Sequence, residues 1–162
     1  MLVLGAANTG KSTLIRNIRM NHDHDFNEEE TKMITQSIRL MTLSALSTLA
    51  SNIIDKASKD LRHDIFSLTS RISAESCYCA DPQLLSRGLR ISRDPLIQDL
   101  MASKSCKMTF YEYRSLLSNV EAILSQDYVP SNDDILASRI PTTGITETVI
   151  EAEAITISLI GT

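Results

Sequence analysis

The chain has 162 residues, 43% hydrophobic and 22% charged, so its composition excludes a disordered protein and leaves room for one ordinary domain core. Its formal net charge of −4 disfavours binding to nucleic acid, because neutralising phosphates requires clustered Lys and Arg. No apolar run approaches the roughly 20 residues that span a bilayer and no signal-peptide pattern is present, which predicts a cytoplasmic protein with reduced cysteines and no transmembrane segment.

The first residues predict a phosphate-binding loop. The apolar residues 1–4, MLVL, are typical of a short strand, and residues 5–12, GAANTGKS, match G-x-x-x-x-G-K-[ST] at every fixed position. In such a loop main-chain amides and a helix N-terminus surround a phosphate, Lys11 neutralises its oxygens, and Ser12 offers a hydroxyl to Mg²⁺. From Ser12 the apolar spacing predicts a helix that ends in the polar run NHDHDFNEEE. The motif alone does not distinguish ATP from GTP.

The middle of the chain predicts a helical bundle. Asn27, followed by three Glu residues, should cap a long helix that runs through about Asp55. Its buried stripe is expected to comprise Ile34, Ile38, Met41, Ala45 and Leu49. Shorter helices are predicted within SKDLRHDIFSLTSRIS and after the Asp-Pro pairs of DPQLLSRGLRIS and DPLIQDLMAS. The segment TFYEYRSLLSNVEAILSQ is predicted to form one further amphipathic helix.

The last part of the chain changes in character. Pro130 ends the helical region, Ser131 is expected to cap a short helix through about Ser138, and Pro141 closes it. Thr, Val and Ile then dominate, so TVIEAEAITISLI is predicted to be a strand.

Two separated motifs together resemble one family. LASRIPTTGITET carries Arg139, Thr142, Thr143 and Gly144, and with the phosphate loop it resembles the heterotrimeric G-protein alpha subunits. In that family the loop usually reads GAGESGKST, and the first switch reads Arg, an apolar residue, Lys, Thr, Thr, Gly, Ile. DYVP and FNEEE are also similar to family segments at the same places.

The resemblance implies a mostly α chain in which a helical-bundle insert is flanked by an incomplete P-loop GTPase α/β piece. Residues 1–20 would supply the first strand, phosphate loop and first helix of that piece. Residues 21–129 would form the all-helical insert domain. Residues 130–162 would supply the linker, the first switch and a following strand.

The resemblance also implies a role for each site residue. Lys11 would hold the beta and gamma phosphates, and Ser12 and Thr142 would coordinate Mg²⁺. Arg139 would be the catalytic arginine supplied in cis, a role already established for this family. The implied nucleotide-binding set is Gly5, Asn8, Thr9, Gly10, Lys11, Ser12, Thr13, Leu136, Ala137, Ser138, Arg139 and Thr142. Without the resemblance, Arg139 would be interpreted as a surface arginine and residues 142–144 as a turn.

Three positions within the two motifs depart from the family pattern. Ala7 replaces a Gly where amides must approach phosphate closely, and Asn8 replaces a Glu that can pair with the switch arginine. Pro141 replaces a Lys, which stiffens the switch and removes an amide donor.

The implied function is GTP binding and hydrolysis that transduces signals from G-protein-coupled receptors. The implied cofactor is Mg²⁺ with GTP or GDP, and the implied partners are the beta-gamma dimer, a receptor and effectors at the inner face of the plasma membrane. The Asp-x-Gly-Gly-Gln and Asn-Lys-x-Asp segments of the family do not occur in these 162 residues, so we expect a fragment that does not complete hydrolysis. Two alternatives stay open: a helical interaction module with a vestigial phosphate loop, and another P-loop NTPase such as a small-molecule kinase.

Overall fold

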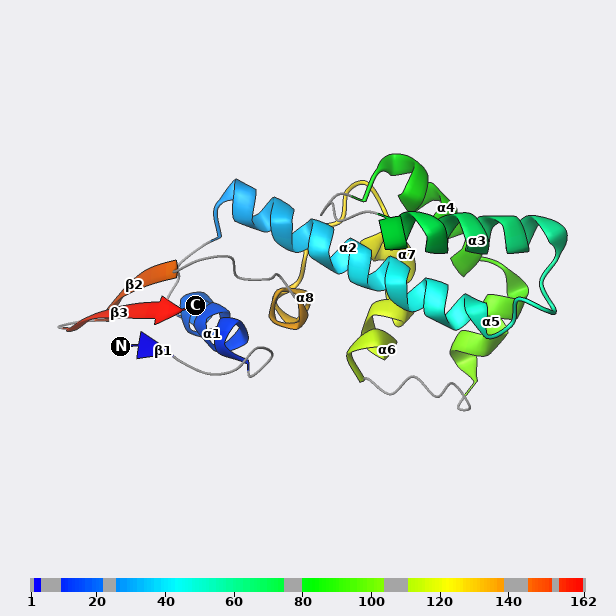
Figure 1. Cartoon of the computed structure of the whole chain (residues 1–162). Helices are drawn as coiled ribbons and strands as arrows, with labels where there is room; N and C mark the ends of the chain where they lie inside the picture. The colour runs from blue at the N-terminus through cyan, green and yellow to red at the C-terminus, as the bar shows by residue number, and fades with distance from the viewer. Residues whose placement is uncertain are drawn as a thin grey trace. The chain divides into compact units, whose positions relative to one another are not determined.

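The computed structural model describes residues 2–3, 10–21, 26–74, 80–103, 111–138, 146–152 and 155–161, the strands by their main chain. The chain divides into two compact units, whose elements are labelled in Figure 1. The first unit comprises Met1–Ile34 and Pro130–Thr162, and the second comprises Thr35–Val129. The insert expected at 21–129 and the second unit both end at Val129, but the expected insert starts at residue 21 and the second unit at Thr35. Assigning the units to a GTPase piece and an insert domain stays a prediction.

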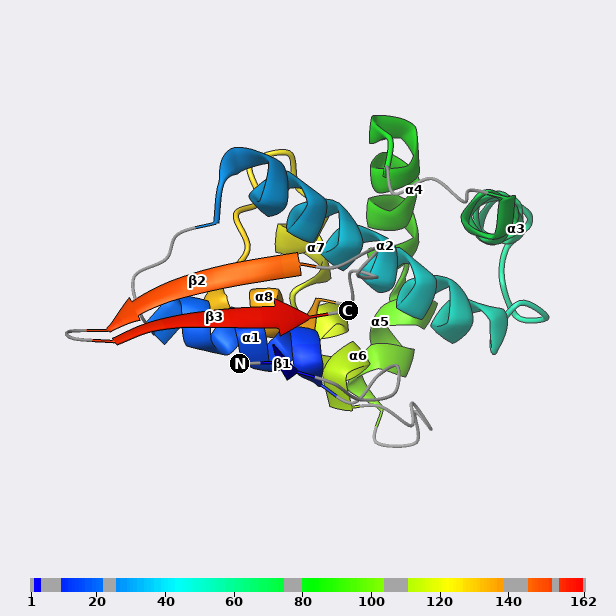
Figure 2. The ribbon, with the colours of Figure 1, turned by 60° about the vertical axis from the view of Figure 1, so that its left-hand side comes forward.

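The first unit contains a three-stranded sheet. Its strands are β1 (Leu2–Val3), β2 (Thr146–Ala152) and β3 (Ile155–Gly161), in the order β1-β3-β2. β3 pairs in parallel with β1 and antiparallel with β2, and Figure 2 shows β2 and β3 side by side. The single strand expected over 148–160 is therefore wrong. With Ala152 opposite Ile155, the chain reverses between them and each half gains a hydrogen-bonded partner.

Two helices accompany this sheet. They are α1 (Lys11–Asn21), which contacts β3, and α8 (Asn132–Ala137), which packs beside α1. The predicted cap at Ser131 is confirmed as a reciprocal capping box: the Asp134 amide donates to Ser131 Oγ at 3.2 Å, and the Ser131 amide donates to Asp134 Oδ2 at 3.0 Å.

The long helix α2 (Glu28–Ser51) begins as predicted. The Glu30 amide donates to Asn27 Oδ1 at 2.8 Å, and the Asn27 amide donates to Glu30 Oε2 at 3.1 Å. It ends at Ser51, about one turn before the predicted Asp55. The side-chain amide of Asn52 donates to the Thr48 and Leu49 carbonyls, which satisfies the last turn and ends the helix there.

The second unit continues with five helices among the described residues: α3 (Lys59–Ala74), α4 (Pro82–Ser92), α5 (Pro95–Ala102), α6 (Tyr111–Ser118) and α7 (Val120–Ile123). Both predicted Asp-Pro starts are confirmed, because Asp81 accepts from the Leu84 amide at 2.7 Å and Asp94 accepts from the Leu96 amide at 3.0 Å. The single helix predicted over 109–126 is wrong. Asn119, with φ −110° and ψ 17°, leaves helical geometry and separates α6 from α7.

The core of the second unit surrounds α2. Of the predicted stripe, Ile38 and Leu49 are almost fully buried and Met41 is only half-buried. Side chains on other faces of α2 are buried as well, so this helix has neighbours on several sides. The largest fully buried side chains are Ile38, Leu43, Leu46, Leu49, Ile65, Leu68, Leu84, Ile91, Ile97, Ile123 and Leu124.

Gly88 of α4 allows the closest packing in this core. A Cβ at this position would overlap Leu43 Cδ2 and lie 2.9 Å from Leu124 Cδ1, and both leucines are fully buried. We expect Gly88→Ala to lower the free energy of unfolding by about 1 kcal/mol, since overpacking by about 1–3 kcal/mol exceeds the gain in helix propensity of about 1 kcal/mol. Urea unfolding followed by circular dichroism measures this. Ser86→Ala, on the exposed side of α4, is the control and should not destabilise; a more stable Gly88→Ala protein would contradict the packing argument.

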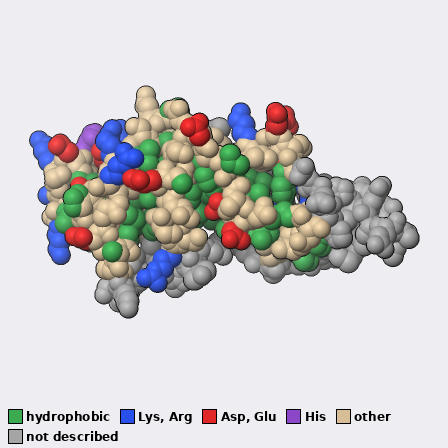
Figure 3. Space-filling view, turned by 180° about the vertical axis from the view of Figure 1, so that it is seen from behind, with side chains coloured by type: hydrophobic (Ala, Val, Ile, Leu, Met, Phe, Trp, Pro, Cys, Tyr) green, Lys and Arg blue, Asp and Glu red, His purple; other side chains and the backbone are tan. Residues whose placement is uncertain are grey.

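Charged side chains of both signs are interspersed over the described part of the face in Figure 3. Asp64 lies 2.7 Å from Arg90 Nη2 and 3.3 Å from Arg87 Nε. The hydrogen bond from Arg90 is the main reason why the pKa of Asp64 lies below its usual value. These pairs connect α3 to α4.

Candidate functional site

Gly10 shapes the end of the predicted phosphate loop. Its φ is +83°, in the left-handed region, and its carbonyl accepts the first helical hydrogen bond, from the Leu14 amide at 2.8 Å. A Cβ at Gly10 would meet no atom within 4 Å, so glycine is required here by the backbone angle and not by lack of space. The chain therefore turns sharply at Gly10 and enters α1 at Lys11.

The first turn of α1 carries three of the predicted nucleotide-binding residues. Lys11 and Ser12 are half-buried, and Thr13 is exposed. The first turn contains no acidic residue, so no carboxylate of this turn itself offsets the positive end of the helix dipole. First-turn amides of an α-helix lack acceptors within the helix, which makes such a terminus suitable for an anion. The geometry of this turn fits a phosphate group.

The end of α8 lies against α1 and carries three more predicted residues. Leu136 and Ala137 are half-buried, and Ser138, the C-cap, is 3% exposed. Arg16 Nη1 donates to the Ser138 carbonyl at 2.6 Å and to Ser138 Oγ at 3.1 Å. Two segments more than a hundred residues apart in sequence are thereby joined within one unit.

The remaining predicted site residues lie outside the described part of the chain. They are Gly5, Asn8, Thr9, Arg139 and Thr142. The departures Ala7 and Pro141 also lie outside it. The roles given to these residues stay predictions.

Sequence reasoning did not find Arg16. Helical spacing places it on α1, but its partner is 122 positions away and neither residue belongs to the phosphate-loop motif. Burial is the main cause of a lowered pKa at Arg16, and the positive charge of Arg19 adds to it. The apolar spacing of Leu14, Ile15 and Ile18 gave no indication that Arg16 has a distant polar partner.

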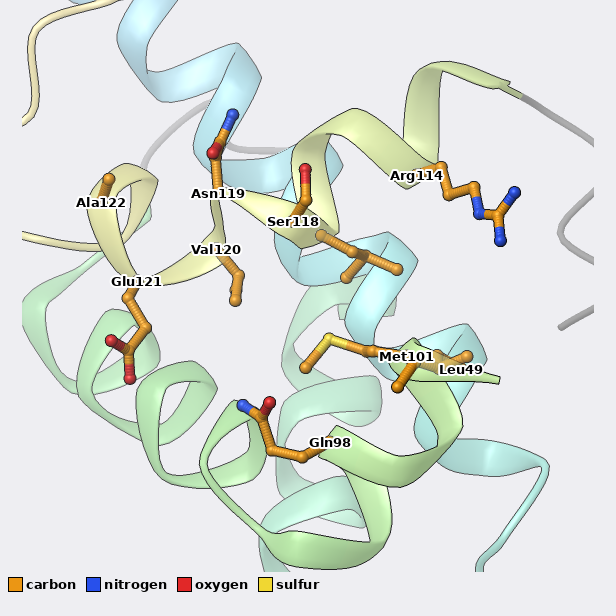
Figure 4. Close-up of a pocket in the computed structure, with 11 residues that line it drawn as sticks. Leu49, Gln98, Met101, Arg114, Ser118, Asn119, Val120, Glu121 and Ala122 are labelled. Atoms are coloured by element: carbon orange, nitrogen blue, oxygen red, sulfur yellow. The ribbon is translucent and has the colours of Figure 1, made fainter. Parts of the chain in front are cut away.

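The second unit contains a pocket of about 650 Å³ at the end of α2, between α5, α6 and α7 (Figure 4). Leu49, Met101 and Val120 contribute apolar surface to it. Two of its polar side chains already have partners: Gln98 Nε2 donates to the Ser92 carbonyl at 2.7 Å, and Glu121 pairs with Arg93 at 2.7 Å. None of the predicted nucleotide-binding residues lines this pocket.

Two features are absent from the described residues. Within them, no group of three or more His, Cys, Asp or Glu side chains is arranged to hold a metal ion. No described helix has the combination of length and apolar character needed to cross a membrane.

Comparison with known proteins gives consistent matches. A family model described as "G-protein alpha subunit" matches residues 1–162. The chain is 28% identical to the guanine nucleotide-binding protein G(o) subunit alpha of Geodia cydonium, over 96% of this chain and 45% of that protein. It is 30% identical to the guanine nucleotide-binding protein alpha-9 subunit of Dictyostelium discoideum, over 99% of this chain and 47% of that protein. The chain thus spans about half the length of the curated relatives it matches.

Proposed function

Because this chain belongs to the G-protein alpha subunit family, we propose that it binds a guanine nucleotide with Mg²⁺ and takes part in signalling. The names of its relatives support guanine as the base. GTP hydrolysis and transduction of receptor signals are proposed for the protein as a whole, on the same family grounds. The same reasoning supports a beta-gamma dimer, a receptor and effectors as partners, and a cytoplasmic location at the inner face of the plasma membrane.

We assign the roles as follows. Lys11 neutralises phosphate oxygens at the N-terminus of α1, and Ser12 directs its hydroxyl to Mg²⁺, where Thr142 would supply a second oxygen. Mg²⁺ prefers oxygen ligands and would screen the negative charge of the phosphates. Leu136, Ala137 and Ser138 would lie near the ribose and phosphates. Arg139, which follows Ser138 directly, would stabilise charge on the transferring phosphoryl group.

One observation supports the proposal most strongly. The helix that begins at Lys11 packs beside the helix that ends at Ala137, within the same unit. These are the two segments that the sequence motifs assign to a single nucleotide. Gly10, with its positive φ, and a first turn without acidic residues give the α1 end the form that a phosphate requires.

Equilibrium titration tests this proposal. Fluorescent GDP, GTP and ATP analogues are titrated into the chain with Mg²⁺, and into Lys11→Ala and Lys32→Ala. We expect GDP and GTP binding in the micromolar range that Lys11→Ala weakens at least tenfold, because a charge-assisted phosphate contact is lost. Lys32, an exposed residue of α2, is the matched control, and Lys32→Ala should bind as the unsubstituted chain does.

Two results would contradict the proposal. Tighter binding of ATP than of GTP, dependent on Lys11, would favour another P-loop NTPase. A folded, helical protein that binds neither nucleotide would favour the interaction module. A specific observation supports that second candidate: residues 35–129 form a compact unit with its own buried core, which provides a folded helical surface without any nucleotide.

A further inference from the structure

We propose that Arg16 is a positioning residue, which fixes the C-terminal end of α8 to α1 and thereby sets how tightly the nucleotide is held. The inference rests on the proposed function and adds to it a residue that neither sequence motif contains. It concerns the contact between α1 and α8, and it needs no contact between Arg16 and the nucleotide.

The contact is a series of hydrogen bonds that runs from Arg16 through Ser138 to Ile135. Arg16 Nη1 donates to the Ser138 carbonyl at 2.6 Å and to Ser138 Oγ at 3.1 Å. The Ser138 hydroxyl then donates to the Ile135 carbonyl at 2.7 Å, one turn back in α8. The guanidinium thus binds the last turn of α8 through both a main-chain and a side-chain oxygen of Ser138. A hydroxyl can accept one bond and donate another, so the arrangement is chemically consistent.

The environment makes this contact strong. Ser138 is 3% exposed and Arg16 is half-buried, so water competes weakly for these oxygens. By contrast, no side chain of α1 is fully buried, and Leu14 is 49% exposed. Polar contacts therefore contribute much of what holds this helix in its unit. Within this unit, the position of α8 relative to the first turn of α1 therefore depends on Arg16.

The two ends joined by Arg16 are the two halves of the proposed site. Lys11 and Ser12 lie on α1 about one turn before Arg16. Leu136 and Ala137 directly precede Ser138 in the chain. When Arg16 holds Ser138, the residues proposed for the phosphates and those proposed for the ribose keep a fixed spacing. Loss of that spacing should speed nucleotide release without removing any proposed ligand.

The test uses the 162-residue chain loaded with a fluorescent GDP analogue and Mg²⁺. Arg16→Met keeps an unbranched side chain but removes both hydrogen bonds, and we expect release of GDP to become about tenfold faster. Arg16→Lys retains the charge and one donor and should restore most of the slow release. Ser138→Ala loses the hydroxyl but keeps the carbonyl, so release should become about twofold to threefold faster. In the double variant, Ser138→Ala should add little to the increase in release rate that Arg16→Met already causes.

Arg19→Met is the matched control. Arg19 lies on the same helix and bonds Glu30 at 2.7 Å, with its guanidinium 4.5 Å from the Phe26 ring centre. Its loss removes a comparable set of contacts that do not involve α8, so release of GDP should change less than twofold. A purely structural role for Arg16 would make the two methionine variants alike.

Amide hydrogen exchange of α8 gives a readout that does not depend on nucleotide. In Arg16→Met the Ser138 amide, which donates to the Ile135 carbonyl, should exchange faster, while amides of α3 should not change. Faster exchange with unchanged GDP release would overturn the positioning role and leave the proposed function intact. Failure of the unsubstituted chain to bind GDP would overturn the proposed function, and the positioning role with it. If the Ser138 amide exchanged at an unchanged rate in Arg16→Met, Arg16 would not hold the end of α8, and the proposal would be overturned.

Discussion

Leu68→Ala is expected to lower the free energy of unfolding by about 2–5 kcal/mol, one of the two largest effects that we predict. Leu68 lies on α3 and has no exposed surface. Its removal takes away the transfer free energy of the deleted atoms and leaves a cavity in a closely packed core. The measurement is equilibrium urea unfolding followed by far-ultraviolet circular dichroism, which reports mainly on the helices of the second unit.

Phe66→Ala is the control for this prediction. Phe66 is two residues away on the same helix and is 70% exposed, so it points to the opposite side from Leu68. Although the deleted side chain is larger, its loss should change the free energy of unfolding by no more than about 0.5 kcal/mol. If the two alanine variants were equally destabilised, the burial pattern of α3 would be wrong.

Arg39→Met is expected to lower the free energy of unfolding by about 3 kcal/mol, which is the second of the two largest effects. Arg39 is 8% exposed, and its guanidinium donates to three main-chain carbonyls, that of Ile123 at the end of α7 and those of Ser125 and Gln126 just after it. The shortest bond, from Nη2 to the Ser125 carbonyl, is 2.5 Å. Methionine keeps the packing of the stem but removes the donor to the buried Ile123 carbonyl and to two part-buried carbonyls, and an unsatisfied buried acceptor is expensive.

Arg93→Met is the comparison that isolates this cause. Arg93 pairs with Glu121 at 2.7 Å, but their side chains are 64% and 57% exposed. An exposed ion pair contributes about 0–1 kcal/mol, so this variant should unfold close to the unsubstituted protein. If both variants lost the same free energy of unfolding, the hydrogen bonds from Arg39 to the carbonyls would not explain the destabilisation of Arg39→Met.

Arg16 and Arg39 use the same chemistry in different units. Each is an arginine on a helix whose guanidinium donates to main-chain oxygen far away in the sequence, one carbonyl for Arg16 and three for Arg39. For both, burial is the first cause of a lowered pKa. Arginine suits this role because its planar fork offers several donors and is weakly hydrated. Lysine at either position would keep the charge but offer a single donor atom in place of the planar fork.

Helix starts were predicted correctly from local chemistry. Asn27, Asp81, Asp94 and Ser131 all cap the helices expected of them, because a cap is a hydrogen bond between residues at most three positions apart. The helix predicted from Ser12 begins one residue earlier, at Lys11, directly after Gly10 with its positive φ. The family, too, could be identified from short motifs.

Helix ends and strand pairing were predicted less well. The end of α2 at Ser51 depends on the Asn52 side chain, which takes carbonyls of the last turn. The break at Asn119 depends on a main-chain conformation outside the helical region, and the periodicity of apolar residues registers neither feature. The division of the last strand into β2 and β3 depends on pairing partners. Period-2 patterning indicates a strand but not where it folds back.

The sequence by itself therefore determined the family, the cap of each helix named above and the phosphate-binding motif, because these depend on neighbouring residues or on fixed short spacings. Only the tertiary structure decided which side of α2 is covered, where the last strand reverses, and that Arg16 binds Ser138. Those features arise from contacts between residues far apart in the chain, whose free energy depends on packing and desolvation that no local pattern contains.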